Sequence, residues 1–139
     1  MNYRELPVAE RSRVNTFYQL TSYKRPVSGD DRVFVAEQRG AICGAVRIEN
    51  RDSVQVLRGM YMLPDRVRQG IGSGLLNFIV PVLAETEAYC IPGDHLFDFY
   101  AQVQFRPIET EAAPGFLIER IKGYFKEGKK VAMMHRIAG

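Results

Sequence analysis

The sequence predicts a mixed α/β fold in which one sheet is flanked by helices. Two observations carry this prediction: strand-like and helix-like segments alternate over the second half of the chain, and a two-sided apolar run lies near its middle. The length of 139 residues suits one compact domain, with 46% hydrophobic and 25% charged residues. We therefore expect a single domain over residues 1–139.

Each expected element rests on the spacing of its apolar residues. Alternation indicates strands, and apolar positions three to four residues apart indicate helices. In chain order we expect a helix over 7–20, strands over 32–38, 41–49 and 54–63, a helix from 70, a strand over 88–92, a helix over 93–103, a strand over 104–109, a helix over 115–128 and a strand over 130–137.

The strand over 54–63 has two special features. After Val56 it becomes apolar on both faces, which is typical of a strand at the centre of a covered sheet. Gly59 lies inside it, and a glycine there predicts a bulge or a close approach of another group to the backbone.

Composition excludes several classes of protein. No apolar stretch is long enough for a membrane span and the N-terminus is too polar for a signal peptide, so we expect a cytoplasmic protein. Cys43 and Cys90 lie in apolar surroundings, and the two histidines are far apart, so we expect no metal. The net charge of +3 is scattered, with no basic stripe among aromatics, so we expect no nucleic-acid partner.

The stretch "PDRVRQGIGSGLL", residues 64–76, has three glycines at every second position where a helix should begin. The first N–H groups of a helix have no internal partner, and the helix dipole adds positive charge there. Small residues let a phosphate reach those groups. The donors that we expect are the backbone of Gly70, Gly72, Ser73 and Gly74 and the side chains of Arg66, Arg68 and Gln69.

Two familiar phosphate loops do not fit this stretch. The nucleoside-triphosphate loop needs Gly-Lys followed by Ser or Thr, and no lysine is present here. The dinucleotide fingerprint needs its third glycine three residues after the second, whereas Gly74 follows Gly72 by two.

The stretch resembles instead the signature of the GCN5-related N-acetyltransferase (GNAT) superfamily. Met62-Leu63-Pro64 matches the end of the family's strand, Gly70 and Gly72 match its two glycines, and Leu75-Leu76 match its leucine pair. The resemblance implies a loop that holds the pyrophosphate of acetyl-coenzyme A. The Arg/Gln position of the motif falls on Val67, so Arg68 is the candidate for that side-chain contact.

A second stretch supports this resemblance. "DFYAQVQF" is similar to the family's Phe-Tyr-x-x-x-Gly-Phe element and aligns Phe99, Tyr100 and Phe105 with it, while Gln104 replaces the glycine. A family asparagine six residues before the phenylalanine is replaced by Gly93. The resemblance implies a mixed sheet with antiparallel N-terminal strands and a splayed parallel central pair.

The resemblance also implies roles in the reaction. Backbone groups of Met60, Tyr61 and Met62 would bind the coenzyme's pantetheine arm, with Phe99 beside the coenzyme. Tyr100 would protonate the departing thiolate as a general acid. The acceptor would be a primary amine of an unknown small molecule or of a peptide, and homodimers are common among relatives.

The general base stays open at this level. Two strand positions that carry a base in relatives are Val56 and Arg58 here, and neither is a good base. The alternatives are a chain of water molecules or one of Glu37, Glu49, His95 and Asp98. Glu37, Arg58 and His95 are our candidates for contact with the substrate. The rival interpretation is a GNAT-like module that binds or senses acyl-coenzyme A without turnover, and the retained Tyr100 argues against it.

Overall fold

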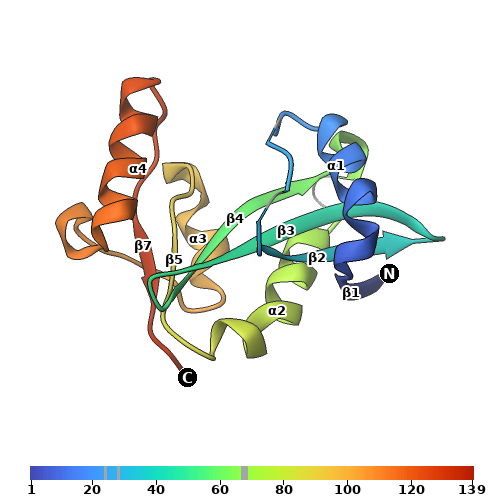
Figure 1. Cartoon of the computed structure of the whole chain (residues 1–139), viewed down its shortest axis with the longest axis horizontal. Helices are drawn as coiled ribbons and strands as arrows, with labels where there is room; N and C mark the ends of the chain where they lie inside the picture. The colour runs from blue at the N-terminus through green and yellow to red at the C-terminus, as the bar shows by residue number, and fades with distance from the viewer. Residues whose placement is uncertain (24, 28, 67–68) are drawn as a thin grey trace.

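The computed structural model describes residues 1–23, 25–27, 29–66 and 69–139. Within this part of the chain, seven strands form one sheet (Figure 1). The strand order is β1-β2-β3-β4-β5-β7-β6. The strands are β1 (Asn2–Leu6), β2 (Arg32–Gln38), β3 (Ala41–Arg51), β4 (Val54–Met62), β5 (Ala88–Cys90), β6 (Arg106–Pro107) and β7 (Met134–Arg136).

The sheet is mixed, as the sequence predicts. Neighbours from β1 to β4 are antiparallel, β4 and β5 are parallel, and β7 is antiparallel to both β5 and β6. The parallel pair is short, because only residues 55–57 of β4 are paired with residues 88–90 of β5 among the described residues. Beyond Leu57 and Cys90 the two strands part.

Strand β1 has no counterpart among the expected elements. Its sequence lacks apolar alternation, since only Leu6 of its five residues is buried. Antiparallel backbone pairing with β2 holds it, and ion pairs with the same strand add to this: Arg4 Nε lies 2.6 Å from Glu37 Oε1, and Arg32 Nη2 lies 2.8 Å from Glu5 Oε1. A strand held by charged side chains gives no period-two hydrophobic signal.

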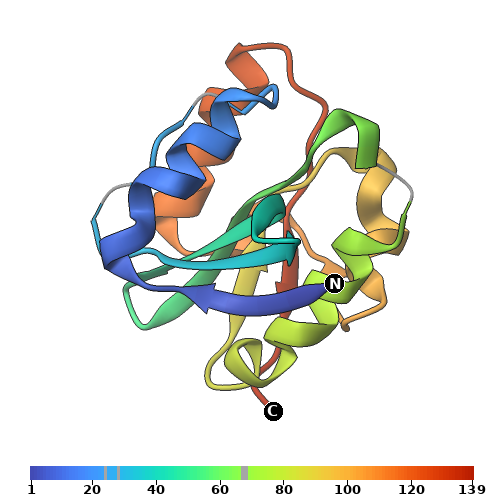
Figure 2. The same cartoon turned by 90° about the vertical axis from the view of Figure 1, so that its right-hand side faces the viewer.

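Helices cover both faces of the sheet (Figure 2). The helices are α1 (Arg11–Gln19), α2 (Ile71–Leu83), α3 (Phe97–Ala101) and α4 (Gly115–Lys126). Helices α1 and α4 lie on one face, and α2 and α3 lie on the other. Successive residues of β4 show this alternation, because Val56 packs against α4 and Leu57 packs against α2 and α3.

Several expected elements are shorter in the structure. A 3-10 turn precedes α1 and another precedes α3, and the strand expected over 104–109 is reduced to the two residues of β6. Among the described residues, none of the helices has both the length and the apolar composition that a bilayer crossing requires.

Gly59 forms a bulge in β4, which confirms the prediction made for it. Its φ is 66°, and β4 has one residue more than β3 between the pairs Tyr61–Ala45 and Arg58–Arg47. The Tyr18 hydroxyl donates a hydrogen bond of 2.8 Å to the Gly59 carbonyl. A Cβ at Gly59 would lie 3.0 Å from that hydroxyl, so the close packing also requires glycine.

Candidate functional site

A cavity of about 580 Å³ opens where β4 and β5 part. Its walls come from residues 56–61 of β4, residues 90–93 at and after β5, the loop between α1 and β2, the turn before α3 and α3 itself, and α4. It has the size of a small-molecule site. Because its walls come from elements on both faces of the sheet, the cavity passes between the two strands.

Tyr100 lines this cavity from α3. The residue is 7% exposed, and its ring is packed edge-on by Phe99 and Phe105, at centroid distances of 5.0 and 6.1 Å. The Tyr100 hydroxyl has no hydrogen-bond partner among the described residues, and its oxygen is not completely buried. Burial raises the pKa of Tyr100 above its ordinary value, so the phenol stays protonated and can act as a proton donor.

The glycine-rich stretch forms the start of α2. Gly70 is the N-cap with a left-handed φ of 77°, and its carbonyl accepts the first helical hydrogen bond, 3.0 Å from the Gly74 nitrogen. The N–H groups of Ile71, Gly72 and Ser73 precede that bond and so have no partner within the helix. Gln69 is exposed beside them, whereas Val67 and Arg68 lie outside the described residues.

Gly72 joins the two motifs. A Cβ at this position would lie 3.0 Å from Cζ of Phe99 and 3.7 Å from Cε of Met62. The ring of Phe99 therefore lies directly on the first turn of α2, next to the strand end. The fold thus brings Gly72, Met62 and the Phe99-Tyr100 pair together from three separate parts of the sequence.

Gly74 has a structural reason of its own. A Cβ there would lie 1.9 Å from the Tyr3 hydroxyl oxygen, so only glycine lets β1 pack against α2 in this arrangement. Its N–H group is also bonded within the helix. Gly74 continues the alternating glycines of the anion motif, and its packing against Tyr3 is a second reason for glycine that the sequence alone does not show.

The end of β4 offers an unpaired backbone edge. Among the described residues, β5 pairs with β4 no further than Leu57, while Tyr61 and Met62 remain paired with β3. Met60 and Tyr61 line the cavity, and Met62 reaches toward Gly72. An extended ligand could form hydrogen bonds with this edge, as a neighbouring strand would.

Two of the three candidate substrate residues reach the cavity. Arg58 lines it from β4, and His95 lines it from the turn after β5. The His95 ring covers Gly93, where a Cβ would lie 2.8 Å from its Cε1. Glu37 does not line the cavity and is held by Arg4 and by Arg13, whose Nη2 lies 2.8 Å from Oε2. The hydrogen bond from Arg4, reinforced by Arg13, lowers the pKa of Glu37.

The structure adds cavity residues that sequence reasoning missed. Tyr23 and Arg25 come from the loop after α1, and Arg120, Tyr124 and Lys129 come from α4 and the segment after it. Arg120 and Tyr124 are four residues apart, so they share one helix face. That spacing is visible in the sequence, but nothing there shows that this face borders the parting strands.

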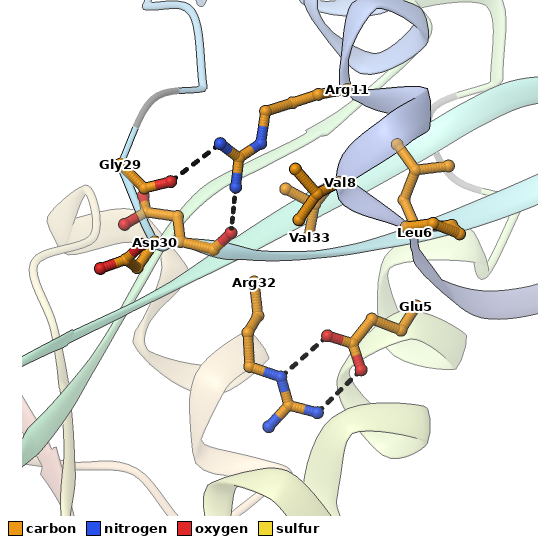
Figure 3. A pocket seen from close by; sticks show the side chains of 10 residues that line it. Glu5, Leu6, Val8, Arg11, Gly29, Asp30, Arg32 and Val33 are labelled. Carbon is orange, nitrogen blue, oxygen red and sulfur yellow. Dashed lines mark hydrogen bonds and ion pairs between the residues drawn. The ribbon is translucent and has the colours of Figure 1, made fainter.

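A smaller pocket of about 210 Å³ lies between β1 and the loop before β2 (Figure 3). Its arginines are occupied by neighbouring groups. Arg11 donates hydrogen bonds of 2.8 and 3.1 Å to the carbonyl oxygens of Gly29 and Asp31, and Arg32 pairs with Glu5. These contacts brace the loop, and none of the residues that line the pocket belongs to either sequence motif. Among the described residues, no group of three His, Cys, Asp or Glu side chains could hold a metal ion.

Comparison with protein families decides the assignment. The family model described as "Acetyltransferase (GNAT) domain" matches residues 29–107, more than half of the chain. The chain belongs to the GNAT acetyltransferase family. It is therefore an acyltransferase of the class that uses acetyl-coenzyme A. A comparison with curated protein sequences found no significant match.

Solved GNAT structures share the fold. Rv2747 from Mycobacterium tuberculosis, in complex with CoA and NLQ, superimposes with a TM-score of 0.72 at 12% identity over 100% of both chains. The ribosomal-protein-S18-alanine N-acetyltransferase from Escherichia coli gives 0.72 at 15% identity over 99% of this chain and 94% of its own.

A third relative is longer than this chain. N-acetylglutamate synthase from Neisseria gonorrhoeae, complexed with coenzyme A and N-acetyl-glutamate, gives a TM-score of 0.61 at 15% identity. The match covers 77% of this chain and 26% of the synthase. At these identities the likeness shows the fold.

Proposed function

We propose that this GNAT protein is an N-acetyltransferase that transfers the acetyl group of acetyl-coenzyme A to a primary amine of a small molecule. One observation carries the proposal: Tyr100 lines a cavity at the point where β4 and β5 part, and its hydroxyl has no hydrogen-bond partner among the described residues. Family membership supports the general activity.

The residues present fit the coenzyme. The N–H groups of Ile71, Gly72 and Ser73, for which no partner is found among the described residues, suit its pyrophosphate, with Gln69 at the rim. The Phe99 ring packs against Gly72 and leaves no room for a side chain on that side. A side chain at position 72 would therefore have to extend into the space beside these N–H groups. The unpaired edge over residues 60–62 suits the pantetheine arm. Val67 and Arg68 remain candidates for a phosphate contact.

The chain's own groups then have separate tasks. Bound acetyl-coenzyme A supplies an acetyl group activated as a thioester. Tyr100 donates its proton to the sulfur as the thiolate leaves. A backbone N–H of the β4 edge holds the carbonyl oxygen of the acetyl group. The cavity walls orient the acceptor amine for attack.

The acceptor amine must lose a proton. Of the four side chains considered for this task, Glu37 is held by arginines outside the cavity, and Asp98 is exposed outside it. Glu49 is bound by Arg58 and Arg120. His95 lines the cavity, so it and cavity water are the remaining acceptors for the proton.

Thiol release in the presence of acetyl-coenzyme A and a panel of small amines tests the proposal. We expect Tyr100→Phe to lower kcat about 100-fold because the leaving thiolate loses its acid, with the affinity for acetyl-coenzyme A unchanged. Tyr89→Phe is the matched control, because Tyr89 bonds to Glu87 outside the cavity. A Tyr100→Phe enzyme with an unchanged kcat would contradict the proposed role.

A further inference from the structure

The walls of the cavity carry charge of one sign. Among the described residues that line it, none is an Asp or Glu. Four of them are basic: Arg25, Arg58, Arg120 and Lys129. From this we infer that the acceptor is a small amino acid-like zwitterion, whose carboxylate binds to Arg58 and Arg120 while its amine faces Tyr100. This inference rests on the proposed acetyl transfer and names its substrate class.

Arg58 and Arg120 are held together by one shared carboxylate, that of Glu49. Glu49 of β3 places Oε1 2.7 Å from Nη1 of Arg120 and 3.1 Å from Nη1 of Arg58, while Oε2 lies 3.1 Å from Nη2 of Arg120. Burial alone would raise the pKa of Glu49, but the two arginines outweigh it and lower the pKa, so Glu49 stays charged. One carboxylate thus faces two guanidinium groups, and a net positive charge is left over.

The two arginines keep donors for a ligand. A guanidinium has five N–H donors. Glu49 takes one from Arg58 and two from Arg120, and the Tyr23 hydroxyl also interacts with Arg58, so each arginine still has donors that these partners do not use. Both side chains are about one-fifth exposed, so their free donors reach the cavity with little water to screen them. A fixed pair of guanidinium groups is a strong receptor for a carboxylate.

The remaining cations border the same region. Arg25 makes no ion pair or hydrogen bond with another described residue, so its charge is uncompensated. Lys129 lies over the ring of Tyr124 at 4.8 Å and 3.2 Å from Glu127, which reduces its contribution. The neutral part of this wall is Tyr23, stacked on Tyr61 with a centroid distance of 5.0 Å. A small polar ligand with one negative group matches this wall.

The coenzyme's phosphates do not account for these cations. Arg58 and Arg120 meet at Glu49 on the face that carries α1 and α4, whereas the start of α2, where we place the phosphates, lies on the opposite face. The cavity of about 580 Å³ must also take the thioester end of the coenzyme. The volume that is left admits a small acceptor.

Binding to the protein saturated with coenzyme A tests the inference by calorimetry, without need of turnover. The ligands are the free α-amino acids, and for each one the matching carboxamide and the matching amine without its carboxylate. We expect at least one amino acid to bind, and its carboxamide and amine to bind about 10- to 100-fold more weakly. Absence of binding by every amino acid, or equal binding by the carboxamides or amines, would overturn the inference.

Variants then locate the site. We expect Arg58→Gln and Arg120→Gln each to weaken amino-acid binding at least about 10-fold and to leave coenzyme A binding unchanged. Lys122→Gln is the matched control, because this exposed lysine is on α4 but does not line the cavity. Unaltered amino-acid binding in both arginine variants would overturn the assignment. The comparison of acid with carboxamide on the unmodified protein does not depend on how well the variants fold.

The two proposals fail in different ways. If amines without a carboxylate are acetylated at least as fast as amino acids, the transferase function stands and the inference of a zwitterionic acceptor is overturned. Failure to bind coenzyme A, with amino acids still bound more tightly than their carboxamides in the unloaded protein, would overturn the transferase function and support the carboxylate site.

Discussion

Gln104 has a backbone conformation that favours glycine. Its φ is 74°, and its side chain is exposed at the turn between α3 and β6. An L-residue in the left-handed region is strained by contact of its Cβ with the backbone. The resemblance to the GNAT element places a glycine here, and the structure gives the physical reason for that glycine.

Replacing Gln104 by glycine should therefore stabilise the protein. We expect Gln104→Gly to raise the free energy of unfolding by about 1 kcal/mol, measured by urea denaturation. Gln102→Gly is the control, because Gln102 has a φ of −64° at the end of α3 and gains nothing from glycine. The account of strain would be contradicted by a Gln104→Gly protein no more stable than the original.

Contacts between elements explain features that no single motif explains. Strand β1 packs against α2 because Gly74 leaves room for the Tyr3 hydroxyl, and β1 is tied to β2 and α1 by a cluster of charged side chains. The Phe99 ring joins α3 to the start of α2 in the same manner. The site is thus held by packing between elements far apart in the chain.

Gly74→Ala tests the contact between β1 and α2. The new Cβ would lie 1.9 Å from the Tyr3 hydroxyl oxygen, so we expect a loss of about 1–3 kcal/mol in the free energy of unfolding. In a Tyr3→Ala background the same change should cost much less, because the obstacle is gone. Equal costs in the two backgrounds would show that this contact does not require the glycine.

The charged cluster at β1, β2 and α1 gives the protein an acid-sensitive element. The hydrogen bond from Arg4 lowers the pKa of Glu37 below its ordinary value of 4.5. A carboxylate with a lowered pKa in the folded state stabilises the protein above that ordinary value, and the stabilisation is lost as the pH falls through the folded pKa.

We expect Glu37→Gln to reduce the dependence of stability on pH in the acid range. Urea denaturation at a series of pH values from neutral to about pH 3 measures this slope for both proteins. Other carboxylates with lowered pKa values, such as Glu10, keep part of the slope in the variant. Identical slopes would show that Glu37 does not contribute.

At the scale of the molecule, much of the fold could be predicted from local patterns. The hairpin of β2 and β3, the central strand β4 and helices α2 and α4 follow from hydrophobic periodicity, and Gly59 marks the bulge. Strand β1 could not be predicted, because its sequence has no apolar alternation and its backbone pairing with β2, reinforced by ion pairs, appears only in the tertiary fold.

Some residues of the site could also be predicted from the sequence, and others could not. Tyr100, Gly72 and Phe99 were found through motifs, and the structure brings them together. Arg58 is a candidate for substrate contact from the sequence alone. Its grouping with Arg25 and Arg120 could not be foreseen, because the three arginines come from a loop, a strand and a helix that only the tertiary fold assembles. Glu49 was considered as a base, whereas its two arginine partners give it a positioning role.

The central claim is that the start of α2 and the parting of β4 and β5 together hold acetyl-coenzyme A. Calorimetric titration of acetyl-coenzyme A into the unmodified protein, Gly72→Glu and Gly123→Glu tests it most directly. Gly123→Glu is the matched control, because a Cβ at this exposed position on α4 meets nothing within 4 Å. Thermal unfolding shows that each protein is folded.

We expect the unmodified protein and Gly123→Glu to bind acetyl-coenzyme A in the micromolar range. Gly72→Glu should bind at least about 100-fold more weakly, because a carboxylate would lie where the phosphates must approach. No binding by the folded, unmodified protein, or unchanged binding by Gly72→Glu, would contradict the account.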